Sequence, residues 1–198
     1  LNSMKKLIII SGPSGAGEDS VIEGLAKLMP IERVVTTTTR DMRKGESEGN
    51  PYHFISREAF QEGLANDDFF EHAKQDRENY YGVTHKEIER VRSSKRIGIW
   101  KVDYKGVFNA KHVLAPEEST AILISAPISV IEQRLRSRDS EHSEAFIQER
   151  LAYAQGWFDH RDIFDHEIEN VQGKLDQTIA TVARIIGEEL GLDKTLDL

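Results

Sequence analysis

Residues 12–19, Gly-Pro-Ser-Gly-Ala-Gly-Glu-Asp, have the glycine spacing of a phosphate-binding loop but carry the wrong charge at its end. The P-loop pattern is Gly-x-x-x-x-Gly-Lys-Ser/Thr, in which the lysine binds phosphates and the hydroxyl reaches Mg²⁺. Gly12 and Gly17 match the glycines, whereas Glu18 stands at the lysine position and Asp19 at the Ser/Thr position. Taken alone, the segment is explained equally well as a glycine-rich turn with acidic residues at a helix start.

The backbone of this loop can still bind an anion without the lysine. Successive N–H groups in such a loop form a nest for anions, and the N-terminus of the next helix adds a partial positive charge. A carboxylate is also a hard-oxygen ligand for Mg²⁺, so Asp19 is a candidate metal ligand. The candidate phosphate-binding residues are Gly12, Ser14, Gly15, Ala16, Gly17, Glu18, Asp19 and Ser20.

A second group of phosphate donors lies between residues 36 and 54. Two arginines, Arg40 and Arg43, can grip a phosphate bidentately, and the hydroxyl of Tyr52 adds a neutral donor. Taken alone, a solvated loop rich in arginine and glycine accounts for the same residues.

Composition excludes several classes of function. The formal net charge of −8 disfavours general binding to nucleic acids or anionic membranes. The absence of cysteine rules out thiol nucleophiles and Cys-based zinc sites and suits a cytoplasmic protein. No apolar run approaches the ~18 residues of a membrane span. Leu1-Asn2-Ser3 before Met4 has the look of a cloning remnant.

The elements that must position these residues alternate between strands and helices. Leu7–Ile10 is a continuous apolar run, which suits a strand buried on both faces of a parallel sheet. The glycine loop follows it directly, and then a helix that Pro30 stops. We expect further strands at 34–39, 97–103, 121–124 and 166–168, and helices from Pro127, at 146–158 and at 175–190. This order predicts an α/β fold with a mostly parallel, doubly wound sheet.

Two stretches interrupt the alternation. Residues 40–83 concentrate aromatic side chains, as expected of a small inserted lobe, with Ser56 capping a helix there. Thr84-His85-Lys86-Glu87 reads as a capping box that opens a helix to about Ser93. Residues 136–145 are almost wholly polar and are predicted to be a loop.

Several motifs in this order resemble the guanylate kinase family over about residues 5–190. They are Thr-Thr-Arg40-x-x-Arg43-x-Gly45-Glu46-x-x-Gly49-x-x-Tyr52-x-Phe54, Phe70-Glu71, Asn79-Tyr80-Tyr81-Gly82, Asp103-Tyr-Lys-Gly106, and Arg134-x-x-x-Arg138 followed by Glu149-Arg150-Leu151. The resemblance implies a single domain over 4–198 with a P-loop NTPase-type parallel sheet flanked by helices. Its core would be 4–36 and 96–190, with a GMP-binding lobe at about 37–95 and a lid at about 136–148.

The resemblance also assigns roles to residues. Glu71 would accept hydrogen bonds from guanine N1–H and the 2-amino group. Thr36 keeps the hydroxyl of the family's serine, whereas Val83 replaces a family Ser/Thr, so that a contact with guanine O6 would depend on Thr84. The implied GMP-binding set is Thr36, Arg40, Arg43, Glu46, Tyr52, Glu71, Tyr81 and Asp103, and Arg134, Arg138 and Arg150 would close over the triphosphate. The implied reaction is GMP + ATP to GDP + ADP with Mg²⁺, in a monomer or homodimer.

One further departure from the family accompanies Glu18. The family's Asp-x-Asp at the end of the strand at 97–103 is Lys101-Val102-Asp103 here. The loop has lost a lysine while this strand has gained one, which suggests a charge exchange in which Lys101 becomes the catalytic cation and Glu18 holds it or helps to bind Mg²⁺. A structural Glu18–Lys101 ion pair in an inactive site is the alternative. The protein would then be a GMP- or protein-binding module, and a kinase for another phosphorylated acceptor is a third possibility.

Overall fold

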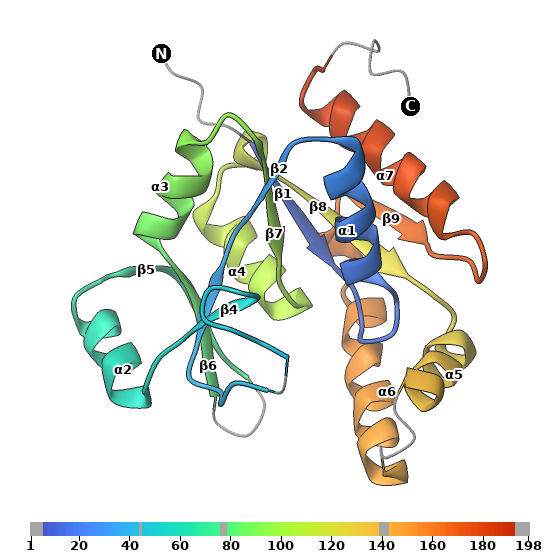
Figure 1. Cartoon of the computed structure of the whole chain (residues 1–198), viewed down its shortest axis with the longest axis horizontal. Helices are drawn as coiled ribbons and strands as arrows, with labels where there is room; N and C mark the ends of the chain where they lie inside the picture. Colours follow the sequence, from blue (N-terminus) through green and yellow to red (C-terminus); the bar gives the residue numbers. More distant parts are fainter. Residues whose placement is uncertain (1–5, 44, 76–78, 139–142, 193–198) are drawn as a thin grey trace.

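The computed structural model describes residues 6–43, 45–75, 79–138 and 143–192. Within these ranges, five parallel strands form the core sheet in the order β2-β7-β1-β8-β9. Their bounds are Ile31–Arg33 for β2, Ile97–Lys101 for β7, Leu7–Ser11 for β1, Ser119–Ser125 for β8 and His166–Glu169 for β9. The predicted α/β fold class is therefore confirmed (Figure 1).

The continuous apolar run of β1 is explained by helices on both faces of this sheet. Ile8 and Ile10 pack in one cluster with α1 (Glu18–Leu28) and α7 (Leu175–Glu189). Leu7 and Ile9 point the other way, into a cluster with α3 (His85–Ser93) and α4 (Tyr104–Val113). The two helices of the first face are close: a Cβ at Gly24 of α1 would lie 2.2 Å from Ile179 Cδ1.

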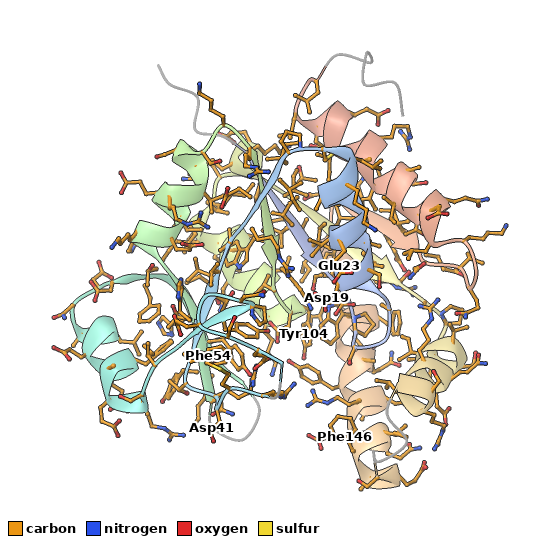
Figure 2. The ribbon with its side chains drawn as sticks, in the orientation of Figure 1. Asp19, Glu23, Asp41, Phe54, Tyr104 and Phe146 are labelled. Atoms are coloured by element: carbon orange, nitrogen blue, oxygen red, sulfur yellow. The ribbon has the colours of Figure 1, made fainter. Side chains whose placement is uncertain are left out.

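A second sheet, the lobe sheet, is inserted between β2 and β7. Within the described ranges it has the strand order β4-β3-β6-β5. Its strands are β3 (Thr36–Thr38), β4 (Tyr52–Phe54), β5 (Phe69–Gln75) and β6 (Asn79–Thr84), and α2 (Arg57–Ala65) packs beside them. Phe60 of α2 stacks on Phe69 and Tyr80, which gives the lobe its small aromatic core. Figure 2 labels Phe54 on this sheet and Asp19 where the glycine loop meets α1.

The structure corrects the second predicted strand. A strand beginning at Val34 was expected, but β2 ends at Arg33 in the core sheet and β3 begins at Thr36 in the lobe sheet. Val34 and Val35 form the connection between the two sheets. The Val35 N–H donates to the Glu87 carboxylate over 2.7 Å instead of to a sheet neighbour. β-branched residues favour extended backbone whether or not a partner strand is present.

The hydrogen bond between the Val35 N–H and the Glu87 carboxylate also changes the predicted capping box at Thr84–Glu87. Ser56 and Thr84 cap α2 and α3 as expected, with Thr84 Oγ1 accepting from the Glu87 N–H. The Glu87 carboxylate binds Val35 and Arg90 instead of returning to the cap.

Three other boundaries differ from prediction. The strand predicted to reach Asp103 ends at Lys101, and α4 follows where no helix was expected. The polar segment 136–145 is not simply a loop, because α5 (Ile128–Arg138) and α6 (Glu144–Asp159) take up its two ends, and 139–142 lie outside the described residues. The described residues also include 3₁₀ turns at Pro116–Glu118 and Arg161–Ile163. No described helix combines the length and the apolar character needed to cross a bilayer.

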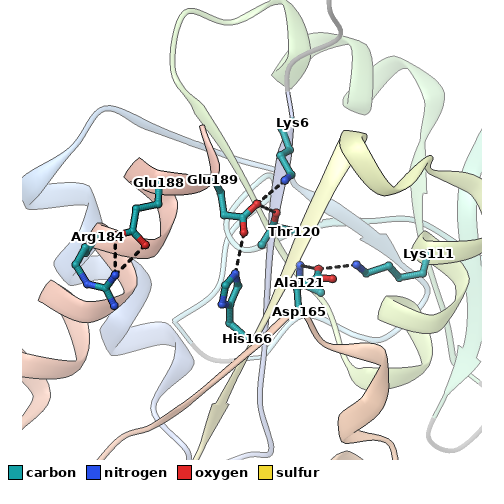
Figure 3. Close-up of polar contacts among 9 residues, drawn as sticks. All are labelled: Lys6, Lys111, Thr120, Ala121, Asp165, His166, Arg184, Glu188 and Glu189. Atoms are coloured by element: carbon teal, nitrogen blue, oxygen red, sulfur yellow. Dashed lines mark hydrogen bonds and ion pairs between the residues drawn. The ribbon is translucent and has the colours of Figure 1, made fainter. Parts of the chain in front are cut away.

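A polar cluster around Glu189 fastens α7 to the edge of the core sheet (Figure 3). The Glu189 carboxylate accepts hydrogen bonds from Lys6, Thr120 and His166. The bond from Lys6, aided by that from His166, lowers the pKa of Glu189 to about 2. Elsewhere in the same view, Asp165 accepts from the Ala121 N–H and from Lys111 and so joins α4 to β8.

We expect Glu189→Gln to lower the free energy of unfolding at pH 7 by about 2 kcal/mol, after allowance for the partly exposed site. Because the folded pKa lies below the ordinary 4.5, this stability exists above about pH 4.5 and is lost as the pH falls towards 2. Urea unfolding at pH 7 and pH 3 measures it. The matched control is Glu188→Gln, which changes an exposed pair with Arg184 and should cost under ~0.5 kcal/mol. Equal losses in the two variants would contradict the assignment.

Candidate active site

The glycine loop has the strand–loop–helix setting that a phosphate-binding loop requires. Gly15 and Gly17 have φ values of +94° and +101°, in the left-handed region that favours glycine. No side chain caps the start of α1. A Cβ at Gly12 would lie 2.5 Å from the Ile124 carbonyl oxygen, so the first glycine is required by the close approach of β8.

Two side chains hold the carbonyl groups of this loop from one side. Arg134 Nη1 donates to the carbonyl oxygens of Gly15 and Ala16, each over 3.1 Å, and Asn170 Nδ2 donates to Ala16 over 2.7 Å. The N–H of Gly17 lies trans to the Ala16 carbonyl across their shared peptide plane, so it points away from Asn170. The loop backbone is thus held in place directly before the uncapped start of α1, where an anion would bind.

The ammonium of Lys101 lies against both acidic residues of the loop. Its Nζ is 2.6 Å from Asp19 Oδ2 and 3.7 Å from Glu18 Oε1. The position follows from the sheet, since β7 pairs with β1 and Lys101 is in register with Ile10, two residues before the loop. Lys101 thus pairs with Glu18, as the sequence suggested, and lies nearer still to Asp19. Arg33 adds a second cation, 3.6 Å from Asp19 Oδ1.

The electrostatics of this cluster keep Lys101 charged. Burial lowers the pKa of Lys101, but the charges of Glu18 and Asp19 outweigh it, so the pKa lies above its ordinary value. Burial raises the pKa of Glu18, an effect that Lys101 opposes only in part. At neutral pH the cluster therefore presents an ammonium to any ligand of the loop.

The predicted phosphate donors of the lobe gather around one ion pair. Arg40 binds Glu46 bidentately over 2.8 and 3.0 Å, and its guanidinium lies 5.4 Å from the centroid of the Tyr52 ring. Tyr81 packs edge-on against Tyr52, with 5.9 Å between ring centroids. Arg43 is exposed and contributes its N–H to Glu46, while Thr36 is buried beside Tyr52 in the β3–β4 pairing.

The lobe cluster faces the loop cluster. Burial raises the pKa of Tyr52, and the charges of Lys101 and Asp19 also act on its hydroxyl. The charges of the loop cluster therefore act on the hydroxyl with which the lobe would bind a phosphate. A phosphate held by Arg40 and Tyr52 would therefore be presented to an anion held by the glycine loop.

Glu71 is buried in surroundings of different chemistry, here termed the Glu71 pocket. Its side chain is 6% exposed, and Oε1 accepts a 3.0 Å hydrogen bond from Asn109 Nδ2. Burial raises the pKa of Glu71 to about 7, with Asn109 lowering it and the charge of Asp103 raising it further. Val83 is fully packed in the core, whereas Thr84 Oγ1 accepts from the Glu87 N–H and keeps its own O–H as a donor, so a contact of Thr84 with guanine O6 stays a prediction.

The comparisons with known proteins agree on one family. The family model described as guanylate kinase matches residues 4–189. The chain belongs to the guanylate kinase family. The guanylate kinase of Chlorobaculum tepidum is 34% identical over 187 residues, which cover 93% of each chain. That of Homo sapiens is 35% identical over 190 residues, covering 92% of this chain and 93% of the relative. The crystal structure of guanylate kinase from Anaplasma phagocytophilum superposes with a TM-score of 0.72 at 28% identity, covering 99% of this chain and 90% of that one.

This membership confirms the predicted family and the class of enzyme, a guanylate kinase. The structure brings the predicted residues together in three groups: the loop with Lys101, the lobe cluster at Arg40, and the pocket of Glu71 with Asp103. Of the three predicted lid arginines, Arg134 contacts the loop backbone. Arg150 of α6 lies over the Phe146 ring at 5.1 Å, and Arg138 ends α5 with its side chain outside the described residues. Arg134 was expected above the triphosphate, but here it holds the loop carbonyls.

Two residues of this guanylate kinase were not found from the sequence. Asn109 lies on the helix α4 that was not predicted, and Asn170 follows directly after β9. The position of Asn170 carried a usable signal, because ligand sites of α/β sheets lie at the carboxyl ends of the strands. Among the described residues, no three His, Cys, Asp or Glu side chains gather into a metal site.

Proposed function

We propose that the chain transfers the terminal phosphoryl group of ATP to GMP, giving ADP and GDP, with Lys101 as the cation that its loop lacks. The observation that carries the proposal is the Lys101 ammonium, 2.6 Å from Asp19 and 3.7 Å from Glu18. Glu18 occupies the position of the usual lysine and Asp19 that of the usual hydroxyl residue. Lys101 at the end of β7 therefore supplies a cation to a loop whose own side chains there are acidic. An ammonium has three donors, and the contact with Asp19 uses one of them.

In this proposal the protein acts by positioning and by charge, without a covalent intermediate. The lobe at 37–95 holds GMP, with its phosphate on Arg40, Arg43, Tyr52 and Tyr81 and its base on Glu71. The loop N–H groups and Lys101 hold the donor phosphates. Arg134, Arg138 in the lid at about 136–148, and Arg150 on α6 offset charge on the transferring group.

The loop also fits the divalent cation that ATP brings with it. Asp19 has a half-exposed hard-oxygen carboxylate at the mouth of the loop, which suits Mg²⁺ bound by one carboxylate, phosphates and water. Mg²⁺ would supply neutralisation of phosphate charge there. Lys101 and Arg33 then remain the two protein cations beside Asp19.

A coupled assay of ADP release from ATP with a panel of acceptors tests the function. We expect turnover with GMP, and a kcat/KM at least ~100-fold lower with AMP, whose base lacks the N1–H and 2-amino donors that Glu71 would accept. IMP, which keeps only the N1–H, should fall between them. GMP binding by calorimetry without turnover would instead identify an inactive binding module. Turnover only with a ribose bisphosphate would identify a kinase for another acceptor.

A further inference from the structure

A chain of contacts runs from the Glu71 pocket to helix α6. Asp103 caps α4, where its Oδ1 accepts from the Gly106 N–H over 2.9 Å. Its second oxygen, Oδ2, accepts a 2.7 Å hydrogen bond from the Tyr153 hydroxyl of α6. The charge of Asp103 acts on Glu71, and Asn109, also on α4, donates to Glu71. Helix α4 therefore contacts Glu71 through Asn109, and it contacts α6 through the hydrogen bond between Asp103 and Tyr153.

The packing around this contact leaves the two helices little freedom. Tyr104, the first residue of α4, packs against Tyr153 and Trp157, with ring centroids 5.8 and 5.0 Å apart. A Cβ at Gly156 would lie 2.6 Å from the Tyr104 ring, so the backbone of α6 approaches α4 as closely as glycine allows. The Trp157 indole N–H donates to Ser11 Oγ over 2.8 Å, which fastens this turn of α6 to the strand before the glycine loop. Figure 2 labels Tyr104, and Phe146 near the far end of α6.

We propose that Tyr153 is a positioning residue for guanine recognition, which fixes the Asp103 carboxylate beside Glu71 and links that pocket to the helix carrying Arg150. Tyr153 lies three residues after Arg150 on α6, so the two side chains occupy neighbouring positions on the helix surface. The inference rests on GMP as the acceptor. In this proposal Tyr153 does not contact GMP itself, but it sets the charge environment of Glu71, which does.

The groups that face Glu71 determine how loss of the Tyr153 hydroxyl would change the protonation of Glu71. On the α4 side they are Asn109 and Asp103; on β6 the paired residue is the apolar Val83; and α3 places His85 against the neighbouring Phe70. Without the Tyr153 hydroxyl, Asp103 keeps its bond to Gly106, but its charge is less compensated. Glu71 then holds its proton to higher pH and is less often the carboxylate that guanine needs.

Calorimetric titration with GMP from pH 6 to pH 9 tests the inference on the whole chain, without turnover. For the wild type we expect the affinity to rise through a midpoint near the pKa of Glu71, about 7. In Tyr153→Phe the midpoint should move up by about 0.5 unit, and the affinity at pH 7 should therefore fall about twofold, because a smaller fraction of Glu71 is ionised. Tyr104→Phe is the matched control, because the described residues offer its hydroxyl no hydrogen-bond partner; its midpoint should not move.

The outcomes separate the inference from the proposed function. A Tyr153→Phe midpoint equal to that of the wild type, or the same shift in Tyr104→Phe, would overturn the role of Tyr153 alone. Failure of the wild type to bind GMP would overturn the proposed function and this inference with it. Tyr153→His, which can restore a donor, should recover part of the wild-type midpoint, whereas a purely steric role for the ring predicts no recovery.

Discussion

Lys101→Asp should lose at least ~10³-fold in kcat, and adding Glu18→Lys to the same chain should recover most of that loss. At an effective dielectric near 20, two charges ~4 Å apart interact by ~4 kcal/mol, so reversing the sign of one costs about twice that. Several powers of ten in rate correspond to such an energy. The double variant returns the lysine to the loop and an acid to the strand, with Nζ and carboxylate exchanging the places that Lys101 and Glu18 hold now. Lys101→Ala should likewise abolish turnover.

The measurement is kcat in the coupled assay, with calorimetric GMP affinity and urea unfolding for each variant. GMP affinity should stay within about threefold of the wild type, since Lys101 lies on the loop side of the site. The matched control is Glu23→Lys in the Lys101→Asp background, which restores the same net charge from an exposed position on α1 (Figure 2). Full activity in Lys101→Ala, or equal rescue by Glu23→Lys, would show that the Lys101 cluster is a structural ion pair.

The loop cluster was within reach of the sequence because its neighbours are set by regular elements. A continuous apolar strand, a glycine loop and a helix fix the place of Glu18 and Asp19, and a second parallel strand fixes that of Lys101. Pairing of parallel strands brings their carboxyl ends to one edge. The structure has the expected ion pair of Lys101 with Glu18, and the closer contact with Asp19 depended on side-chain geometry that the sequence does not give.

The residues that the sequence did not reveal depend on tertiary packing. No helix was predicted at 104–113. A Cβ at Gly106 would lie 2.0 Å from Val102 Cγ2, so this glycine is required by the close turn from β7 into α4. Once α4 is missed, Asn109 and its bond to Glu71 are missed too. For Arg134, in contrast, the helix was predicted but the contacts of the side chain were not. The motif located it correctly on α5, but its hydrogen bonds to the loop carbonyls depend on how α5 packs against the loop.

Glu71→Gln should lower kcat/KM for GMP by about 10²–10³-fold while making the folded protein more stable at alkaline pH. The amide keeps one acceptor but places an NH₂ group against the guanine donors, leaving buried polar atoms unpaired. For the wild type, kcat/KM should rise as the pH passes through about 7, where Glu71 becomes the carboxylate, and this rise should be absent from the variant.

The stability change has the opposite sign because the folded pKa of Glu71 lies above the ordinary 4.5. The stability that this group contributes is complete below about pH 4.5 and is lost as the pH rises through about 7, at a cost of up to ~3 kcal/mol at pH 8. The neutral amide avoids that cost, so urea unfolding should find Glu71→Gln more stable than the wild type at pH 8 and little changed at pH 5. Glu62→Gln, an exposed change on α2, should alter neither activity nor stability. A loss of stability at pH 8 in Glu71→Gln would mean that the carboxylate is held by donors in the folded chain, and would remove the basis for its titration near neutrality. A gain in stability together with a loss of guanine recognition would instead show that this buried acid is kept for binding at the expense of folding.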